Sequence, residues 1–393
     1  MQKFYVIGLS DSRHQYFVPE VVSLIAKGKI FSGGKRHHEI VASLLPEQAT
    51  WIDITVPLSD VFLQYRNHQE IIVFASGDPL FYGFANTIRR ELPEAEIRLL
   101  PTFNSLQTLA HRLLIPYQQM RNVSLTGRDW DVFDEALIRG ESLIGALTDR
   151  EKTPATIAAR MLEFGYNNYH IYIGEALGND EEENIYSMTL EEASKSKFNF
   201  PNCLLLKKTC LRKHPFGIPE KDFNLLNGRS KMITKMPIRL TSLSMLELSD
   251  KHSFWDIGFC TGSVSIEAKL QFPFLKVTSF ERRAECAELM KQNCRKFGSP
   301  GITPVIDDFL TADISKLPAP DAIFIGGHGG QLAEMMQRID QVLLPGGVIV
   351  FNSVSNESQK LFCESIQKIH RQVTNCVHIA VDLFNPIEII QAK

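Results

Sequence analysis

Residues 254–262 have the sequence FWDIGFCTG. The apolar run at its start contains an aspartate, and two glycines and a threonine lie in the segment after that run. In a parallel α/β sheet such a loop lies at the carboxyl edge, where glycines allow close approach of the backbone and the next helix presents unpaired N–H groups to a ligand. The pattern predicts a nucleotide-type site formed by Asp256, Gly258, Thr261 and Gly262. An ordinary strand-to-helix turn has the same residue types, so both interpretations remain open.

Two acidic residues follow the next apolar runs. Glu281 comes directly after Val277–Phe280 and lies 25 residues beyond Asp256. That is close to the separation of about 20 residues at which dinucleotide sites place an acid that binds the ribose hydroxyls. Asp308 follows another short run, where its carboxylate can accept a hydrogen bond from an adenine amino group while Phe309 packs against the ring. A solvent-exposed acid at a strand end explains Asp308 equally well.

His328 is surrounded by four glycines in residues 326–330, after the apolar run Ala322–Ile325. Glycine fills no volume there and costs backbone entropy, so packing does not explain this loop. We interpret His328 as a solvent-accessible residue beside a ligand loop. A role in proton transfer and a flexible loop without any ligand are the two other interpretations.

A second candidate ligand loop lies in the first half of the chain, where residues 76–83 (SGDPLFYG) follow the apolar run Ile71–Ala75. Gly77 and the Asp-Pro pair after it force a turn at the carboxyl end of the strand, the edge at which α/β folds bind ligands. A turn that caps the next helix through Asp78 is the alternative.

Two charged clusters accompany these loops. Residues 35–38 (KRHH) follow two glycines, and they can bind an anionic ligand or form the solvated start of a helix. An acidic cluster consists of Asp129, Asp131, Asp134 and Glu135. Its spacing matches no loop that binds hard cations, so we predict a solvated helix face instead of a metal site.

The length and composition of the chain limit its class. Its 393 residues exceed one ordinary hydrophobic core, so two domains of about 200 residues each are expected. The net charge is -3 and the basic residues are dispersed, which argues against a protein built mainly for nucleic acid. The seven cysteines form no CxxC pair, which favours a reduced, cytoplasmic compartment without structural zinc. We find neither a signal peptide nor an apolar run of about 18 residues.

Short apolar runs alternate with longer mixed segments along the whole chain, as in layered α/β folds. The predicted strands are Phe4–Ile7, Ile71–Ala75, Ile97–Leu100, Leu143–Leu147, His170–Ile173, Cys203–Leu206, Phe254–Ile257, Val277–Phe280, Ala322–Ile325 and Val348–Phe351. One predicted helix, residues 284–297, places Cys286, Met290 and other apolar residues on one face, and Gly298 is its expected stop.

Several segments of the first half together resemble the tetrapyrrole methylases, which use S-adenosylmethionine. The resemblance covers most of residues 1–209. It depends first on the signature Gly77-Asp78-Pro79, here called the GDP loop, which is followed by Tyr82-Gly83. The other segments that carry it are VIG at 6–8, SGGKRH at 32–37, PTFNS at 101–105, SLTGR at 124–128 and TDREKTP at 148–154. In particular, the set looks like the subfamily that methylates carbon 5 of a precorrin.

This resemblance implies a two-lobed α/β domain in which the GDP loop and two later strand ends enclose the cofactor. The cofactor-binding residues that it implies are Gly77, Asp78, Ser105 and Thr153. A precorrin carries many acetate and propionate carboxylates, so the candidate substrate-binding residues are Lys35, Arg36, His37 and Tyr82. Many family members have further glycines after the first strand, whereas this chain has LSDS at 9–12, which leaves substrate contacts of that loop open.

Charges, two prolines and a glycine fill residues 207–219 and predict a linker with its boundary between Thr209 and Phe216. We therefore expect domains at 1–209 and 210–393. The second half resembles another family, the decarboxylating precorrin methyltransferases that act at carbon 15, in residues 216–223, 232–240, 321–330, 344–352 and 357–358. A helix is expected to begin near Thr234-Lys235 and to cover the edge of the following sheet.

The second resemblance implies a Rossmann-like methyltransferase domain with its own S-adenosylmethionine site. The glycine loop, Glu281 and Asp308 are then cofactor-binding residues, and His328 and Asn352 are candidates for binding substrate. The family's loop reads DxGxGxG, but Cys260 replaces the middle glycine. Its β-carbon crowds a backbone that must approach the cofactor unless the local dihedral angles suit an L-residue, so we predict a displaced or weaker site.

Together the resemblances imply an enzyme of cobalamin biosynthesis that methylates a precorrin at carbons 5 and 15 and decarboxylates its carbon-12 acetate. The expected partners are a tetrapyrrole and a second copy of the chain, without nucleic acid, a membrane or a metal held by the protein. Whether the substrate contains cobalt stays open, and no catalytic acid or base is identified. The alternatives are an RNA or protein methyltransferase on the same folds, a nicotinamide-dependent dehydrogenase and a non-catalytic scaffold.

Overall fold

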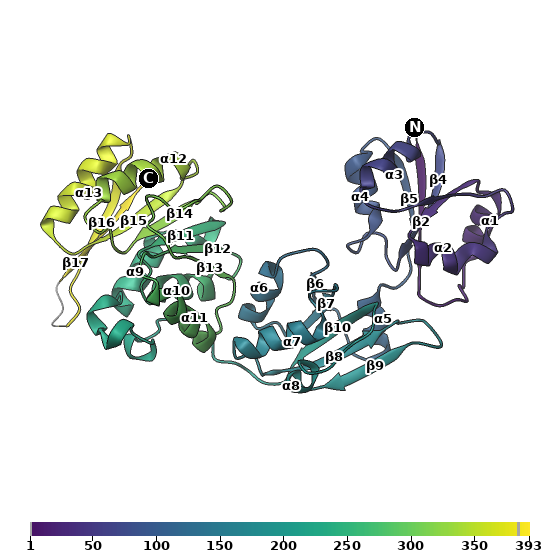
Figure 1. The fold of residues 1–393 in the computed structure, drawn as a ribbon, viewed down its shortest axis with the longest axis horizontal. Helices are drawn as coiled ribbons and strands as arrows, with labels where there is room; N and C mark the ends of the chain where they lie inside the picture. The colour runs from purple at the N-terminus through teal and green to yellow at the C-terminus, as the bar shows by residue number, and fades with distance from the viewer. Residues whose placement is uncertain (1, 383–385) are drawn as a thin grey trace. The chain divides into compact units, whose positions relative to one another are not determined.

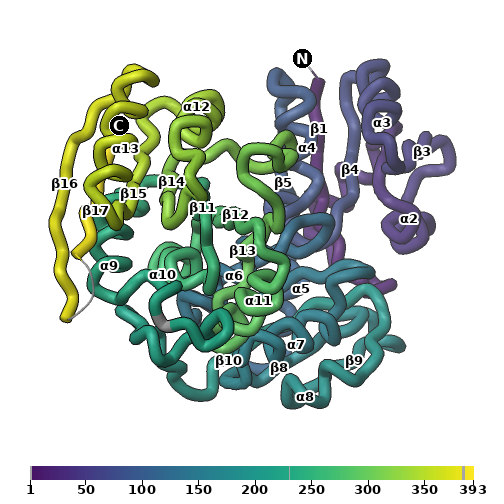
Figure 2. Tube along the Cα trace, turned by 60° about the vertical axis from the view of Figure 1, so that its left-hand side comes forward, coloured from purple at the N-terminus to yellow at the C-terminus, as the bar shows by residue number. Residues whose placement is uncertain are grey.

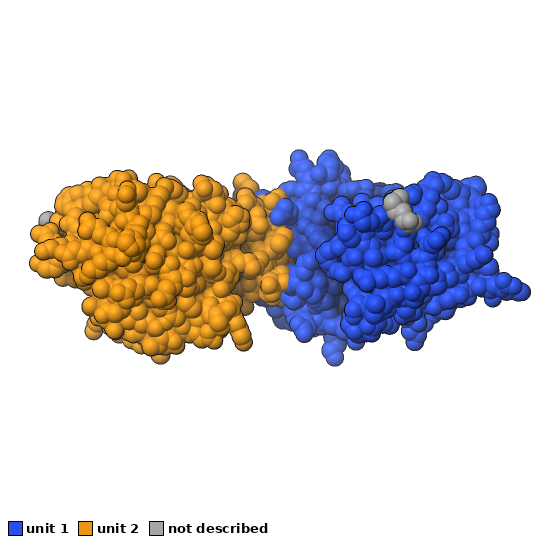
Figure 3. All heavy atoms as spheres, turned by 90° about the horizontal axis from the view of Figure 1, so that it is seen from above, with its two compact units in different colours: residues 1–128, 142–159, 169–209 blue, residues 129–141, 160–168, 210–393 orange. Residues whose placement is uncertain are grey.

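The computed structural model describes residues 2–382 and 386–393, which form two compact units (Figure 3). Unit 1 consists of residues 1–128, 142–159 and 169–209, and unit 2 of residues 129–141, 160–168 and 210–393. The predicted strands all coincide with strands of the structure. Among the described residues, no helix has the length and apolar character needed to cross a membrane.

The first sheet of unit 1 is parallel throughout, in the order β3-β2-β4-β1-β5. Its strands are β1 (Lys3–Leu9), β2 (Ile30–Gly33), β3 (Thr50–Asp53), β4 (Glu70–Ser76) and β5 (Glu96–Leu100). Alternate residues of β1 and β4 enter separate hydrophobic clusters on opposite faces, Phe4 and Val73 on one and Ile7 and Phe74 on the other. Burial of both faces explains why these strands are continuous apolar runs.

Four helices supply the cover for those two faces. They are α1 (Pro19–Lys27), α2 (Lys35–Val41), α3 (Leu58–Tyr65) and α4 (Phe84–Glu91), with the 3-10 turn η1 (Ala42–Leu44) after α2. Helices α3 and α4 pack in the cluster of Phe4, whereas α1 and α2 pack in that of Ile7. All loops at the carboxyl ends of β1, β2 and β4 therefore emerge at one edge of the sheet.

The second sheet of unit 1 is mixed, in the order β6-β7-β10-β8-β9. Its strands are β6 (Arg121–Ser124), β7 (Leu143–Leu147), β8 (Tyr169–Glu175), β9 (Asn184–Met188) and β10 (Asn202–Lys208). Only β6 and β7 are parallel, and the remaining pairs are antiparallel. Helix α5 (Ser105–Leu113) packs on this sheet, where Leu106 and Leu109 contact Leu205. Three more helices follow α5 along this part of the chain: α6 (Asp131–Arg139), which belongs to unit 2, α7 (Pro154–Glu163), which belongs to unit 2 from residue 160, and α8 (Leu190–Ala193) of unit 1.

The acidic cluster on α6 is not the fully solvated face that we predicted. Asp131 is partly exposed, but the side chain of Asp134 is completely buried and receives two hydrogen bonds from Arg160, at 2.9 and 2.6 Å. A buried carboxylate requires such a partner, because desolvation penalises the unpaired charge. The sequence pattern could not reveal this contact, since Arg160 lies 26 residues further along the chain.

Unit 2 contains one seven-stranded sheet in the order β13-β12-β11-β14-β15-β17-β16 (Figure 1). Its strands are β11 (Ser253–Ile257), β12 (Lys276–Phe280), β13 (Ile302–Val305), β14 (Ala322–Ile325), β15 (Val348–Ser353), β16 (Val373–Ile379) and β17 (Ile387–Ala392). Strand β17 is antiparallel to both of its neighbours, and the other neighbouring pairs are parallel. The strand order reverses beside β11, so the loops after β11 and β14 flank a topological switch point.

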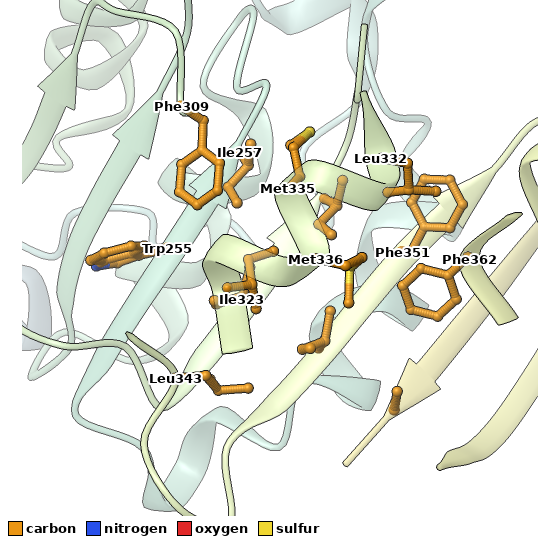
Figure 4. Packing of buried hydrophobic residues seen from close by; sticks show 14 of the residues in the cluster. Trp255, Ile257, Phe309, Ile323, Leu332, Met335, Met336, Leu343, Phe351 and Phe362 are labelled. Atoms are coloured by element: carbon orange, nitrogen blue, oxygen red, sulfur yellow. The ribbon is translucent and has the colours of Figure 1, made fainter. Parts of the chain in front are cut away.

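Helices cover both faces of this sheet (Figure 2). They are α9 (Met236–Met245), α10 (Ser263–Gln271), α11 (Glu285–Phe297), α12 (Leu332–Val342) and α13 (Asn356–Lys368), with 3-10 turns η2 (Glu220–Asp222), η3 (Leu226–Gly228), η4 (Ser230–Met232) and η5 (Leu248–Asp250). Figure 4 shows one face, where Met335 and Met336 of α12 lie among Ile257, Ile323 and Phe351. On the other face, α9 contributes Ile238 to the cluster of Phe254, so α9 covers a face of the sheet and not its edge.

A buried ion pair connects α9 to α10, and its further hydrogen bonds reach the segment before α9. Arg239 and Glu267 are both completely buried, and Arg239 Nε donates to Glu267 Oε2 at 2.6 Å. The other two guanidinium nitrogens donate to the carbonyls of Thr234, at 2.7 Å, and Ile218. Glu267 Oε1 accepts from the N–H groups of Gly217 and Ile218. The pair thus fixes residues 217–239 against the helix that follows the glycine loop.

Replacement of Glu267 by Gln tests this pair. The amide can still accept hydrogen bonds, but the Arg239 charge loses its counter-ion in a dry site, so we expect unit 2 to lose about 3–5 kcal/mol of stability. Urea unfolding of the full chain, followed through the transition of unit 2, measures the loss. Glu364→Gln, which breaks the exposed Lys360–Glu364 pair, should change little. Equal midpoints for both variants would contradict the assigned role.

Candidate functional site

A cavity of about 680 Å³ in unit 2 opens at the carboxyl ends of β11, β12 and β14. The predicted residues that line it are Asp256, Gly258, Thr261, Glu281, Asp308, His328 and Asn352. Gly262 is not among them. Residues 231–235, held in place by the Arg239 network, supply another wall that the sequence analysis did not include.

The glycines of the loop after β11 are required by backbone contacts. Gly258 has φ of +83°, and a β-carbon on it would lie 3.0 Å from the nitrogen of Gly327 in the loop after β14. Gly262 has φ of +76° and caps α10, where a β-carbon would lie 2.9 Å from Cγ of Met290. Both positions favour glycine for conformation and for space. The function of Gly262 is therefore to shape the loop.

Cys260 also adopts a left-handed conformation, with φ of +49°. An L-residue tolerates this conformation at a cost of about 1–2 kcal/mol. Its side chain is buried in the cluster that contains Cys286 and Met290 of α11, and its N–H donates to Glu281 Oε2 at 3.2 Å. The cysteine thus replaces the expected glycine without leaving the backbone geometry that glycine prefers.

Asp256 is buried beneath the loop and points toward the start of α10. Its Oδ2 accepts from the hydroxyl of Ser265 and from the Ser265 N–H at 3.2 Å. Burial raises the pKa of Asp256 to about 7, and the charge of Glu281 acts in the same direction, against the hydrogen bonds from Ser265. Its Oδ1 and the hydroxyl of Thr261 have no protein partner. Two unpaired polar atoms beside the glycine loop fit the polar methionine end of S-adenosylmethionine.

Glu281 lies where a ribose-binding acid is expected, but protein donors already occupy its carboxylate. Arg283 donates through Nε at 2.9 Å, Nη2 at 2.7 Å and its backbone N–H at 3.1 Å. Burial opposes ionisation of Glu281, but these bonds and that from Cys260 outweigh it and lower its pKa. A ribose diol must share this carboxylate with Arg283 or displace it. Sequence reasoning overlooked Arg283, although a cation two residues after the acid was its visible signal.

The remaining predicted residues of this cavity have local contacts. Asp308 Oδ1 accepts from the Leu310 N–H at 2.9 Å, which turns the chain after β13. His328 is half-buried, its Nδ1 accepts from the Gly330 N–H at 3.2 Å, and burial lowers its pKa. Asn352 Oδ1 accepts from the hydroxyl of Ser242 at 3.0 Å. The predicted solvent-accessible histidine is thus partly covered.

In unit 1 the GDP loop is joined to the ends of two other strands. Gly77, with φ of +59°, donates its N–H to the Leu9 carbonyl at 2.8 Å and accepts from the Thr102 N–H at 3.3 Å. A β-carbon on Gly8 would lie 1.9 Å from the Gly77 oxygen, so this crossing requires glycine. Asp78 Oδ1 accepts from the Leu80 N–H at 2.9 Å.

The two later cofactor candidates of unit 1 begin helices. Ser105 starts α5, directly after the loop that Gly77 touches, and its side chain acts to lower the pKa of the buried Cys203 thiol, which burial raises. Thr153 precedes α7, where its hydroxyl accepts from the Thr156 N–H at 3.2 Å. The structure therefore brings Gly77, Asp78 and Ser105 together, whereas the contacts of Thr153 are local to its own helix.

The candidate substrate-binding residues of unit 1 fall into two places. Lys35 is exposed, while Arg36 and His37 both contact the hydroxyl of Ser76, at 3.0 and 2.9 Å. Tyr82 instead lines a separate pocket of about 530 Å³, where its hydroxyl donates to the Asn122 carbonyl and the Arg128 guanidinium lies 4.8 Å from its ring centre. Within the described residues, no group of three or more acids, histidines and cysteines is arranged to hold a metal ion.

Comparisons with known proteins identify the family. A model described as "Tetrapyrrole (Corrin/Porphyrin) Methylases" matches residues 3–194, and one described as "Precorrin methyltransferase domain" matches residues 227–388. The precorrin-6Y C(5,15)-methyltransferase [decarboxylating] of Sinorhizobium sp is 30% identical over 367 residues, which are 91% of this chain and 86% of that protein. The chain belongs to the precorrin-6Y C(5,15)-methyltransferase family. Both resemblances seen in the sequence are thereby confirmed.

Two further relatives each match a part of the chain. The cobalt-precorrin-6B C(15)-methyltransferase (decarboxylating) of Salmonella typhimurium is 32% identical over 167 residues, 42% of this chain and 85% of that protein. A crystal structure of precorrin-6y C5,15-methyltransferase from Geobacter metallireducens has 33% sequence identity and a TM-score of 0.42, and it covers 45% of this chain and 97% of its own. The two family models, which match residues 3–194 and 227–388, agree with the predicted fold class.

The raised pKa of Asp256 predicts a specific pH dependence. The folded state favours the protonated carboxyl, whose ordinary pKa is about 3.9. The stabilisation from this group is therefore complete below about pH 4 and is lost as the pH rises toward 7. Asp256→Asn should flatten the dependence of unit 2 stability on pH between about 4 and 7, measured by urea unfolding. Identical slopes for the variant and the wild type would show that the carboxyl does not titrate there.

Replacement of Cys260 by Gly tests the effect of the β-carbon in the loop. Relief of the left-handed strain offsets the loss of a buried thiol, so we expect stability to change by less than about 1 kcal/mol. The affinity of unit 2 for S-adenosylhomocysteine should rise, because the backbone can approach the ligand more closely. Calorimetric titration of the full chain measures it. Unchanged affinity would mean that the loop tolerates the cysteine without penalty.

Proposed function

We propose that this chain methylates a precorrin or cobalt-precorrin at carbons 5 and 15 and decarboxylates its carbon-12 acetate, as a step of cobalamin biosynthesis. The observation that carries the proposal is the match to a decarboxylating C(5,15)-methyltransferase along 91% of the chain. Two distinct ligand loops, one in each unit, support a separate S-adenosylmethionine site for each methylation. The domains that follow from this are 1–209 for carbon 5 and 210–393 for carbon 15.

The chemistry requires positioning more than covalent participation. When bound, S-adenosylmethionine supplies an electrophilic methyl group for in-line displacement, so the protein must hold a ring carbon against it. In unit 2, Asp256 and Thr261 would bind the polar methionine end, and Glu281 the ribose. In unit 1, Gly77, Asp78 and Ser105 would bind the cofactor, with Thr153 as a further candidate. The closed backbone contacts of both loops keep these groups in fixed positions.

The substrate partner in this proposal is a tetrapyrrole with several carboxylate arms. His328 and Asn352 line the cavity of unit 2 and would contact the ring, and Lys35, Arg36, His37 and Tyr82 are the candidates in unit 1. The half-buried His328 has a lowered pKa, so it is neutral near pH 7. Because its Nδ1 accepts from the Gly330 N–H, its Nε2 carries the N–H and can donate a hydrogen bond to the substrate. We further propose a cytoplasmic homo-oligomer that holds no metal of its own.

Paired variants test the assignment of one site to each reaction. Asp78→Ala should lower methylation at carbon 5 alone, because it changes the GDP loop of unit 1. Glu281→Gln should weaken cofactor binding and methylation at carbon 15 alone, because a neutral amide is a poorer acceptor for ribose hydroxyls and releases Arg283. Mass spectrometry of products from metal-free and cobalt-bound precorrin, each given with S-adenosylmethionine, separates the two events.

The wild-type chain provides the decisive control for the function itself. Two methyl additions and one loss of carbon dioxide are expected. No mass gain with either tetrapyrrole would reject the proposed function, and loss of both methylations in either variant would show that the reactions share one site.

A further inference from the structure

Ser76 is an exposed residue at the carboxyl end of β4, directly before Gly77 of the GDP loop. Its hydroxyl oxygen contacts two side chains from the first turn of α2, the helix that follows β2. Arg36 Nη2 lies 3.0 Å from it and His37 Nε2 lies 2.9 Å from it. Arg36 is itself fixed by Asp11 of the loop after β1, at 3.1 Å. Three strand ends therefore contribute to one polar cluster.

The direction of each hydrogen bond follows from His37. The Gly34 N–H donates to Nδ1 of His37 at 3.2 Å, so Nδ1 carries no proton. Burial, with the charge of Arg36, lowers the pKa of His37 to about 4, and the ring is therefore neutral near pH 7. A neutral imidazole has one N–H, which must then be on Nε2. His37 consequently donates to Ser76, as Arg36 does.

A serine hydroxyl can accept two hydrogen bonds and donate one. The N–H groups of His37 and Arg36 occupy both acceptor positions of Ser76. Within residues 2–382 and 386–393, no protein atom accepts the Ser76 proton. The Ser76 hydroxyl can therefore only donate a further hydrogen bond at the edge of the sheet. The Arg36 guanidinium beside it retains N–H groups that are not used by Asp11 or Ser76.

We propose that Ser76 and Arg36 together bind a carboxylate at the edge of the GDP loop. The hydrogen bond from His37 orients the Ser76 hydroxyl so that its proton points away from His37, toward the ligand. A hydroxyl donor beside a guanidinium matches the two oxygens of a carboxylate and offers nothing to a cation. The inference rests on the proposed function, which supplies two carboxylate sources: the acetate or propionate arms of the tetrapyrrole, and the methionine end of S-adenosylmethionine. It adds Ser76 to the candidate substrate-binding residues. Arg36 then binds the carboxylate directly, whereas His37 orients the Ser76 hydroxyl.

The test uses the full chain and the variant Ser76→Ala. Loss of one hydrogen bond to a charged group should raise the KM for the tetrapyrrole in carbon-5 methylation about tenfold, with kcat changed little. Carbon-15 methylation by the same molecule should be unchanged and serves as the internal control. Ser59→Ala, on the exposed start of α3, is the matched variant and should leave both reactions unchanged.

Two more measurements identify the source of the carboxylate and the role of the hydroxyl. If S-adenosylhomocysteine binding to unit 1 weakens in Ser76→Ala while the KM for the tetrapyrrole stays the same, the carboxylate belongs to the cofactor. Ser76→Thr keeps a hydroxyl and should restore most of the affinity. His37→Leu should raise the KM for the tetrapyrrole less than Ser76→Ala does, because the Ser76 hydroxyl remains as a donor.

The outcomes separate this site from the proposed function. An unchanged KM together with unchanged S-adenosylhomocysteine affinity in Ser76→Ala would overturn the carboxylate site, even in a chain that performs both methylations. A wild-type chain that binds S-adenosylhomocysteine but methylates no tetrapyrrole would instead overturn the proposed function. The binding measurement would then still decide whether Ser76 contacts the cofactor.

Discussion

The architecture of unit 2 depends on the buried pair of Arg239 and Glu267. Two charges in a fully dry site are tolerated only when every donor and acceptor is satisfied, and here backbone groups of Gly217, Ile218 and Thr234 complete the network. The pair therefore does more than join two side chains. It holds the segment that forms one wall of the cavity against the helix that begins at the glycine loop, so the wall and the loop cannot move independently.

The same principle of fixed backbone contact operates at both ligand loops. In unit 1 the Gly8 backbone crosses the Gly77 carbonyl, and in unit 2 Gly258 meets Gly327. Each contact joins neighbouring parallel strands at their carboxyl ends, where any β-carbon would separate them. The loops are thus rigid because glycine permits closeness, although glycine is elsewhere associated with flexibility. Rigid loops of this kind suit a reaction that depends on holding two reactants in line.

The sequence predicted those parts of the fold whose cause is local in the chain. Continuous apolar runs identified the buried parallel strands, and Gly298 correctly marked the end of α11. Longer-range features were missed: the antiparallel placement of β17 and the burial of Asp134 with Arg160. In each case the deciding contact joins residues whose meeting depends on the final packing, which a pattern of residue types does not specify.

The two sites differ in what they leave unsatisfied, and this difference is chemically informative. In unit 2 the unpaired groups are a buried oxygen of Asp256 and the hydroxyl of Thr261, while the acid at the ribose position is occupied by Arg283. In unit 1 the free group is the proton of Ser76, whose oxygen is already saturated. A site that offers a hydroxyl proton beside a guanidinium selects an anion, whereas one that offers a carboxylate oxygen selects a donor. At the strand edge the two units therefore differ in the polar groups described: unit 2 has an unpaired buried oxygen, and unit 1 has a hydroxyl donor beside a guanidinium.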